Sequence, residues 1–73
     1  LVEDDEFIGE SIKEYFEFSN NKVDYFSNPK KALETVYPAY YDIFLFDVNM
    51  EEMSGFKLYE ELKRYADVPV IFI

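Results

Sequence analysis

Three acidic side chains, in two stretches far apart in the chain, are the first candidates for chemistry. Glu3 and Asp4 directly follow an apolar pair at the start of the chain. Asp47 directly follows the apolar run at residues 43–46. Carboxylates can bind hard metal ions and can act as nucleophiles. The chain holds no histidine and no cysteine, which excludes disulfides, thiolate metal sites and histidine-based catalysis from this segment.

The residues before Asp47 predict a rigid strand. Four apolar residues stand in a row, and because side chains alternate along a strand, both faces of this strand are apolar. Such a strand belongs in the middle of a parallel sheet that is covered on both faces. Ligands of open α/β sheets bind just beyond the carboxyl ends of the strands, which is where Asp47 stands. Position alone explains Asp47 equally well as a residue that caps a turn.

The remaining pattern predicts helices and strands in alternation. Apolar residues at helical spacing predict helices at residues 6–18, 29–37 and 55–65. Apolar runs predict strands at residues 1–2, 22–26, 42–46 and 68–73, the second of them a half-polar edge strand. Asp5 and Asn28 are suitable N-caps for the first two helices, and Pro29 suits a first helical position. The order β-α-β-α-β-α-β predicts an α/β fold with a parallel sheet and right-handed crossovers.

Parallel strands bring their carboxyl ends to one edge of the sheet. If the first and third strands are neighbours, Glu3, Asp4 and Asp47 converge there. Three close anions repel one another, and a divalent cation relieves that repulsion. Oxygen ligands favour a hard ion such as Mg²⁺, and the backbone carbonyl of Asn49 adds another oxygen. Acids at the start of a helix can also serve only its dipole, which would account for Glu3 and Asp4 but not for Asp47.

Composition argues against two classes of function, binding to nucleic acid and spanning a membrane. The net charge of −9 disfavours binding to nucleic acid, since an acidic segment repels phosphate. No apolar run approaches the roughly 20 residues that span a membrane, and no signal peptide is visible. The length of 73 residues corresponds to one domain or part of one. Because the chain starts without methionine and finishes inside a predicted strand, we expect it to be a fragment of a longer α/β domain.

Taken together, these features resemble the receiver domain of two-component response regulators. The resemblance rests on the run Val2-Glu3-Asp4-Asp5, on Phe46-Asp47 at a strand end, and on Gly55 eight residues beyond Asp47. It covers essentially the whole chain. It implies a flavodoxin-like, doubly wound parallel sheet with strand order 2-1-3-4-5. Residues 1–73 would then be the N-terminal part of a single receiver domain, cut within its fourth strand.

The resemblance also implies a function. Asp47 would accept a phosphoryl group from a sensor histidine kinase, as a signalling phosphoacceptor and not as a classical enzyme. Asp4, Asp47 and the Asn49 carbonyl would bind Mg²⁺ directly, and Glu3 would hold the ion through water. The phosphorylated form would switch an output domain or protein target outside this segment, with homodimerisation on activation as a possibility. The family implies a cytoplasmic location, with no nucleic acid or membrane bound by this segment.

Two other functions share part of this pattern. A phosphatase of the haloacid dehalogenase type needs a second aspartate two residues after the nucleophile, where this chain has Asn49. A receiver-like module that binds proteins without being phosphorylated remains an alternative. The Ser or Thr and the Lys that distinguish the two belong after the fourth and fifth strands, beyond Ile73. Glu51 also departs from the family, in which many members have proline at that point.

Overall fold

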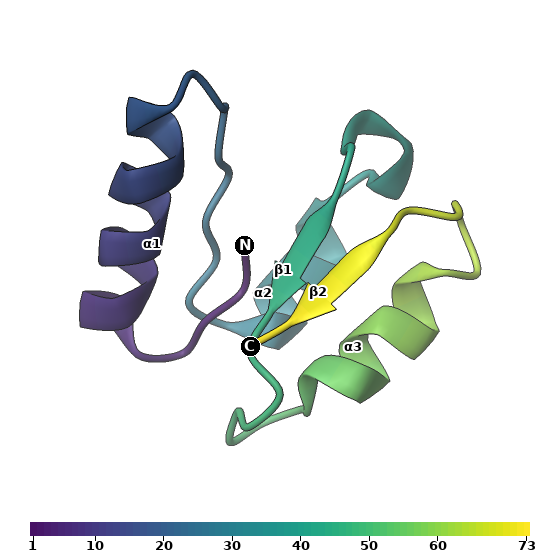
Figure 1. The fold of residues 1–73 in the computed structure, drawn as a ribbon. Helices are drawn as coiled ribbons and strands as arrows, with labels where there is room; N and C mark the ends of the chain where they lie inside the picture. The colour runs from purple at the N-terminus through teal and green to yellow at the C-terminus, as the bar shows by residue number, and fades with distance from the viewer.

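The computed structural model describes all 73 residues and contains a small parallel sheet with helices packed around it (Figure 1). The elements are α1 (Glu6–Phe18), α2 (Pro29–Thr35), the 3-10 helix η1 (Pro38–Tyr40), β1 (Phe44–Phe46), α3 (Gly55–Leu62) and β2 (Val70–Phe72). None of the helices is long and apolar enough to cross a membrane.

The predicted N-caps are confirmed. The Asp5 side chain accepts hydrogen bonds from the backbone N–H groups of Phe7 and Ile8, at 3.0 and 3.2 Å. The Asn28 side chain does the same for the second and third residues of α2, at 2.8 and 3.2 Å, behind Pro29 at the first helical position. These side chains satisfy donors that the first turn of a helix cannot pair internally, so they determine where α1 and α2 begin.

The order of the parallel segments agrees with the sequence prediction as far as the chain extends. β1 pairs with β2 in parallel, with Phe46 opposite Phe72. On the other side of β1, Val2 forms one parallel bridge with Phe46 and another with Phe26. The four segments therefore lie in the order second, first, third, fourth.

The prediction of four full strands is wrong, because only β1 and β2 form strands. Residues 1–2 and 22–26 are joined through single bridges. Three backbone hydrogen bonds join these two segments: from Phe26 N–H to the Leu1 carbonyl, from Glu3 N–H to the Phe26 carbonyl, and from the Leu1 amino group to the Asp24 carbonyl. These bonds are too few to extend the ladder beyond one bridge. β1 and β2 are also shorter than the predicted 42–46 and 68–73.

Two helices end earlier than the sequence predicts. α2 ends at Thr35 and not at residue 37, because Val36 is already extended, as is Tyr37 before Pro38. Residues 38–40 then form η1. α3 ends at Leu62 and not at residue 65, and the N–H of Tyr65 closes a tight turn onto the Leu62 carbonyl at 3.0 Å. Tyr65, which the helical pattern placed in the last turn of this helix, lies beyond it and is exposed.

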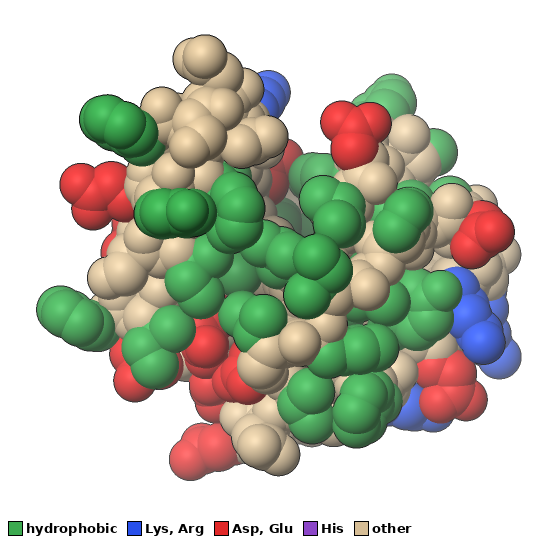
Figure 2. Space-filling view, viewed as in Figure 1, with side chains coloured by type: hydrophobic (Ala, Val, Ile, Leu, Met, Phe, Trp, Pro, Cys, Tyr) green, Lys and Arg blue, Asp and Glu red, His purple; other side chains and the backbone are tan.

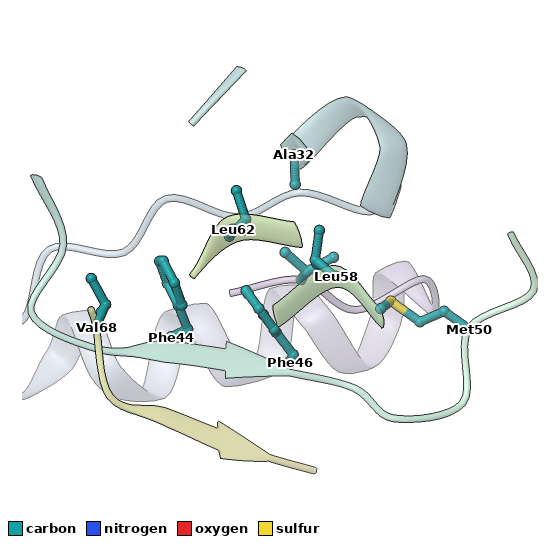
Figure 3. Close-up of a cluster of buried hydrophobic side chains, with 8 residues drawn as sticks. Ala32, Phe44, Phe46, Met50, Leu58, Leu62 and Val68 are labelled. Carbon is teal, nitrogen blue, oxygen red and sulfur yellow. The ribbon is translucent and has the colours of Figure 1, made fainter. Parts of the chain in front are cut away.

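The main core lies between β1 and the pair α2 and α3. Figure 3 shows Phe44 and Phe46 projecting from β1 toward Leu58 and Leu62 of α3. The stacked Phe44 and Phe46 rings have centroids 5.0 Å apart. The other buried members of this core are Val2, Ala32, Met50 and Val68. This cluster anchors the strand that ends at Asp47.

Helix α1 lies on the other face of the strands. Phe26 packs against the main core, whereas the ring of the preceding residue, Tyr25, lies against Gly9 of α1. Since neighbouring residues in an extended segment point to opposite faces, α1 and the pair α2 and α3 cover different faces. Figure 2 shows hydrophobic side chains at the surface between α1 and α3. Among the large hydrophobic residues of the chain, Ile43, Ile71 and Ile73 are about half exposed.

Candidate functional site

The structure brings the three predicted acidic residues together. Glu3, Asp4 and Asp47 each offer a carboxylate oxygen, and these oxygens all lie within 4.8 Å of one another. The backbone explains the convergence. The N–H of Asp47 donates to the carbonyl of Val2 at 2.9 Å, so the end of β1 and the start of the acidic run are held side by side. The sequence prediction that the first and third segments are neighbours is confirmed.

Glu3 is the buried member of this cluster, with 5% of its surface exposed. Burial is the largest cause that raises the pKa of Glu3 to about 7. The backbone N–H of Asp5, 3.2 Å from Glu3 Oε2, opposes the rise, and the carboxyls of Asp47 and Asp4 reinforce it. The carboxyls of Asp4 and Asp47 therefore lie beside a buried Glu3 carboxyl that is itself difficult to ionise.

Within residues 1–73, no salt bridge joins a basic side chain to this cluster. The salt bridges of the structure join Lys57 and Arg64 to Glu61 on α3 and its C-terminal turn, away from the cluster. The donor atoms are all oxygens, which suits a small hard cation and not a soft one. The residues therefore fit Mg²⁺, which would neutralise the cluster.

Backbone amides of the following loop contact two of the acids. The N–H of Asn49 donates to Asp47 Oδ1 at 3.3 Å, and the N–H of Glu51 donates to Asp4 Oδ2 at 3.4 Å. These long bonds place the loop at residues 48–54 over the cluster. The role of the Asn49 carbonyl as a metal ligand stays a prediction.

The cluster borders a polar hollow of about 160 Å³, lined by Asp4, Ser27, Asn28, Pro29, Glu51 and Glu52. Asp4 is exposed to it while Glu3 is buried beneath the surface. The cluster is therefore open to solvent on the side of Asp4.

Gly55 explains how the loop returns to the core so close to Asp47. A Cβ atom at Gly55 would overlap the carbonyl oxygen of Asp47 and would lie 3.3 Å from Cβ of Phe46. Only glycine permits this approach of α3 to the end of β1. Ser54, for which the sequence analysis above makes no prediction, caps α3 by accepting a hydrogen bond from Lys57 N–H at 3.1 Å. Its position one residue before the helix could have indicated the cap.

Tyr25 is the site residue that sequence reasoning missed. Its hydroxyl donates a hydrogen bond of 2.7 Å to the backbone carbonyl of Glu3. Burial first, and then the charge of Glu6, raises the pKa of Tyr25, so its hydroxyl stays protonated and remains a donor. The sequence placed Tyr25 only within the predicted edge strand at residues 22–26, and no local pattern predicts a contact across 22 positions.

The fold and the site define a class of protein: an α/β domain of parallel segments with three carboxylates at the carboxyl edge of its sheet. The family model for the response regulator receiver domain matches residues 1–73. The chain belongs to this family, as the sequence resemblance predicts. Receiver domains are signalling phosphoacceptors of two-component systems and not classical enzymes, and they work with a cognate histidine kinase and typically with Mg²⁺.

Known proteins support the assignment. The chain is 35% identical to the transcriptional regulatory protein CrdR of Helicobacter pylori and 36% identical to the heme response regulator HssR of Staphylococcus saprophyticus, over its whole length in both cases. It spans only 35% and 33% of those two proteins. The solved structure of the non-phosphorylated HemR receiver domain from Leptospira biflexa superimposes with a TM-score of 0.89 at 30% identity, over 97% of this chain and 58% of that one.

Proposed function

We propose that this receiver domain accepts a phosphoryl group on Asp47 in a reaction that depends on Mg²⁺. The observation that carries the proposal is the convergence of Glu3, Asp4 and Asp47, with carboxylate oxygens within 4.8 Å of one another at the end of a buried strand. The matched family supports the same assignment. A nucleophile held by a packed strand starts close to its attacking geometry, which lowers the entropic part of the barrier.

In the proposed reaction, a carboxylate oxygen of Asp47 attacks the phosphorus of a phosphohistidine on the kinase. An O–P bond forms, the P–N bond breaks, and the imidazole nitrogen leaves with the electron pair and takes up a proton. Asp4 and Asp47, the carbonyl of Asn49 and, through water, Glu3 would hold Mg²⁺. When bound, the ion neutralises negative charge on the transferring phosphoryl group.

The proposed partners follow from the family. A sensor histidine kinase supplies the phosphoryl group, and an output domain or protein target outside residues 1–73 responds to it, with homodimerisation on activation as one route. A relative at 35% identity is named a transcriptional regulatory protein, which supports an output that acts on transcription. We place this signalling in the cytoplasm, where the absence of cysteine is compatible with a reducing compartment.

The test uses the full-length protein, acetyl phosphate and intact mass spectrometry. We expect one phosphoryl adduct in the presence of Mg²⁺ and none with a chelator, and the adduct should be labile to hydroxylamine as an acyl phosphate. Asp47→Asn should abolish the adduct while the fold is kept, since a neutral amide is not a nucleophile. Asp5→Asn is the matched control: it changes a neighbouring acid whose role is to cap α1, and labelling should persist.

Two outcomes would contradict the proposal. An adduct that survives Asp47→Asn would show that another residue is the acceptor. A wild-type protein that gains no adduct from acetyl phosphate or from histidine kinases would favour the alternative, a receiver module that binds proteins without being phosphorylated.

A further inference from the structure

The backbone of Glu3, in the acidic cluster, is held on both sides by two consecutive residues of a distant segment, Tyr25 and Phe26. The N–H of Glu3 donates to the carbonyl of Phe26 at 3.1 Å. The carbonyl of Glu3 accepts the Tyr25 hydroxyl at 2.7 Å. The first contact is an ordinary backbone bridge, whereas the second comes from a side chain and depends on the residue type. The Tyr25 hydroxyl therefore contacts the backbone from which the Glu3 carboxyl projects.

The Tyr25 ring reaches Glu3 only because Gly9 of α1 has no side chain at the point where the ring passes. Gly9 is the one buried residue of that helix. A Cβ atom at Gly9 would overlap the end of the Tyr25 ring, including its Cζ and hydroxyl oxygen. Gly9 has an ordinary negative φ, so its backbone conformation would accept alanine. The helix tolerates a residue with low helix propensity at this position because the missing side chain makes room for Tyr25.

We propose that Tyr25 is a positioning residue for the acidic cluster, and that Gly9 provides the space in α1 that this role requires. The inference rests on the proposed function for the metal role of Glu3. By fixing the Glu3 carbonyl, the Tyr25 hydroxyl keeps the Glu3 carboxyl beside Asp4 and Asp47. Losing that bond leaves the residue types of the cluster unchanged but lets Glu3 move away from the other two acids.

The experiment measures Mg²⁺ affinity by isothermal titration calorimetry on the full-length protein. Tyr25→Phe keeps the ring and removes only the hydroxyl, and the Kd for Mg²⁺ should rise roughly three- to tenfold, at or below the low end for groups that orient metal ligands. Gly9→Ala should raise the Kd by a similar factor although alanine favours the helix, because it displaces the Tyr25 ring. In the double variant the two losses should not add, since both act through one hydrogen bond.

Tyr41→Phe is the matched control. The hydroxyl of Tyr41 also makes a hydrogen bond, of 2.6 Å to Asp24 Oδ2, but Tyr41 precedes β1 and lies at the opposite end of the strand from Asp47. It should leave the Kd for Mg²⁺ unchanged. Asp4→Asn should weaken binding strongly and so identifies the cluster as the binding site.

Hydrogen exchange provides a readout without metal. The N–H of Asp5 donates to the Glu3 carboxyl at 3.2 Å, so its exchange should accelerate in Tyr25→Phe and Gly9→Ala but not in Tyr41→Phe. If wild type binds Mg²⁺ through Asp4, and Tyr25→Phe alters neither the Kd nor the Asp5 exchange, the inference is overturned and the proposed function stands. If wild type does not bind Mg²⁺, the metal proposal fails, and the Asp5 exchange alone decides whether Tyr25 holds Glu3.

Discussion

Glu3 and Asp4 are adjacent acids of one cluster with different surroundings. Glu3 is buried beneath the surface, where its carboxyl loses hydration and its pKa rises to about 7, while Asp4 is exposed beside the polar hollow. A buried carboxyl next to two others is costly to ionise, and a bound cation removes that cost. The ionisation of Glu3 should therefore affect both the stability of the fold and its affinity for a cation, and both should depend on pH.

We expect the metal-free protein to lose stability as pH rises from about 5 to 8. The folded-state pKa of Glu3, about 7, lies above the ordinary value of 4.5, so between these values the folded state binds more protons than the unfolded state. The stabilisation is complete below pH 4.5 and is lost as pH rises through 7. Its size is on the order of 3 kcal/mol. Urea unfolding of the full-length protein at a series of pH values, with a chelator present, measures it.

Glu3→Gln separates this effect from other titrations. The amide cannot ionise, so most of the fall in the free energy of unfolding between pH 5 and 8 should disappear. Glu34→Gln, at an exposed position of α2, should leave the fall intact. Mg²⁺ should flatten the profile in wild type, because the ion favours the ionised cluster. A pH dependence that is the same in Glu3→Gln and wild type would contradict the assignment.

At the scale of the elements, α3 determines how closely the loop can approach Asp47. Its first residue, Gly55, touches the backbone of Asp47, and its buried side chains Leu58 and Leu62 pack on β1. The side chains of α3 therefore pack against β1, and the N-terminus of α3 contacts the end of that strand. A change at this junction should act on both the fold and the site.

We expect Gly55→Ala to destabilise the full-length protein by about 1–3 kcal/mol, because the new methyl group overlaps the Asp47 carbonyl and forces backbone movement. This loss should exceed the small gain in helix propensity from alanine. Thermal unfolding measures it. Glu60→Ala, at an exposed position in the same helix, should change stability by no more than about 0.5 kcal/mol. Equal melting temperatures for Gly55→Ala and wild type would show that the junction relaxes freely.

At the scale of the whole molecule, a large apolar surface stays open to solvent. Only 13 of the 73 residues are buried, and Ile43, Ile71 and Ile73 keep about half of their surface exposed. The apolar face predicted for α1 is only partly covered, with Ile8 and Tyr15 exposed. Figure 2 shows such side chains gathered over the strands between α1 and α3. The chain alone therefore gains less from hydrophobic burial than its composition suggests.

We expect a peptide of residues 1–73 not to fold cooperatively as a monomer. At this size burial is marginal, and the outer edge of β2 is unpaired. Circular dichroism during heating, on a sample shown to be monomeric, tests this. A sharp two-state transition would contradict it and would mean that the core around Phe44, Phe46 and Leu58 is sufficient.

The sequence by itself determined the class of fold, the family and which three acids converge at the edge of the sheet. These depend on local patterns: the N-caps Asp5 and Asn28, the alternation of elements, and an aspartate after a strand that is apolar on both faces. Periodicity also located the starts of the three helices. The ends were less predictable, because they depend on the conformation that Pro38 imposes and on how the last turn of α3 packs.

Only the tertiary structure decided which acid is buried and what holds it. Neighbouring residues such as Glu3 and Asp4 have similar chemistry, and their exposure depends on packing against segments far along the chain. The bond from Tyr25 to the Glu3 carbonyl spans 22 positions and needs the space at Gly9, so three distant residues must meet before any of them has this role. No periodic pattern encodes such a contact, because it depends on the shapes of side chains from different elements.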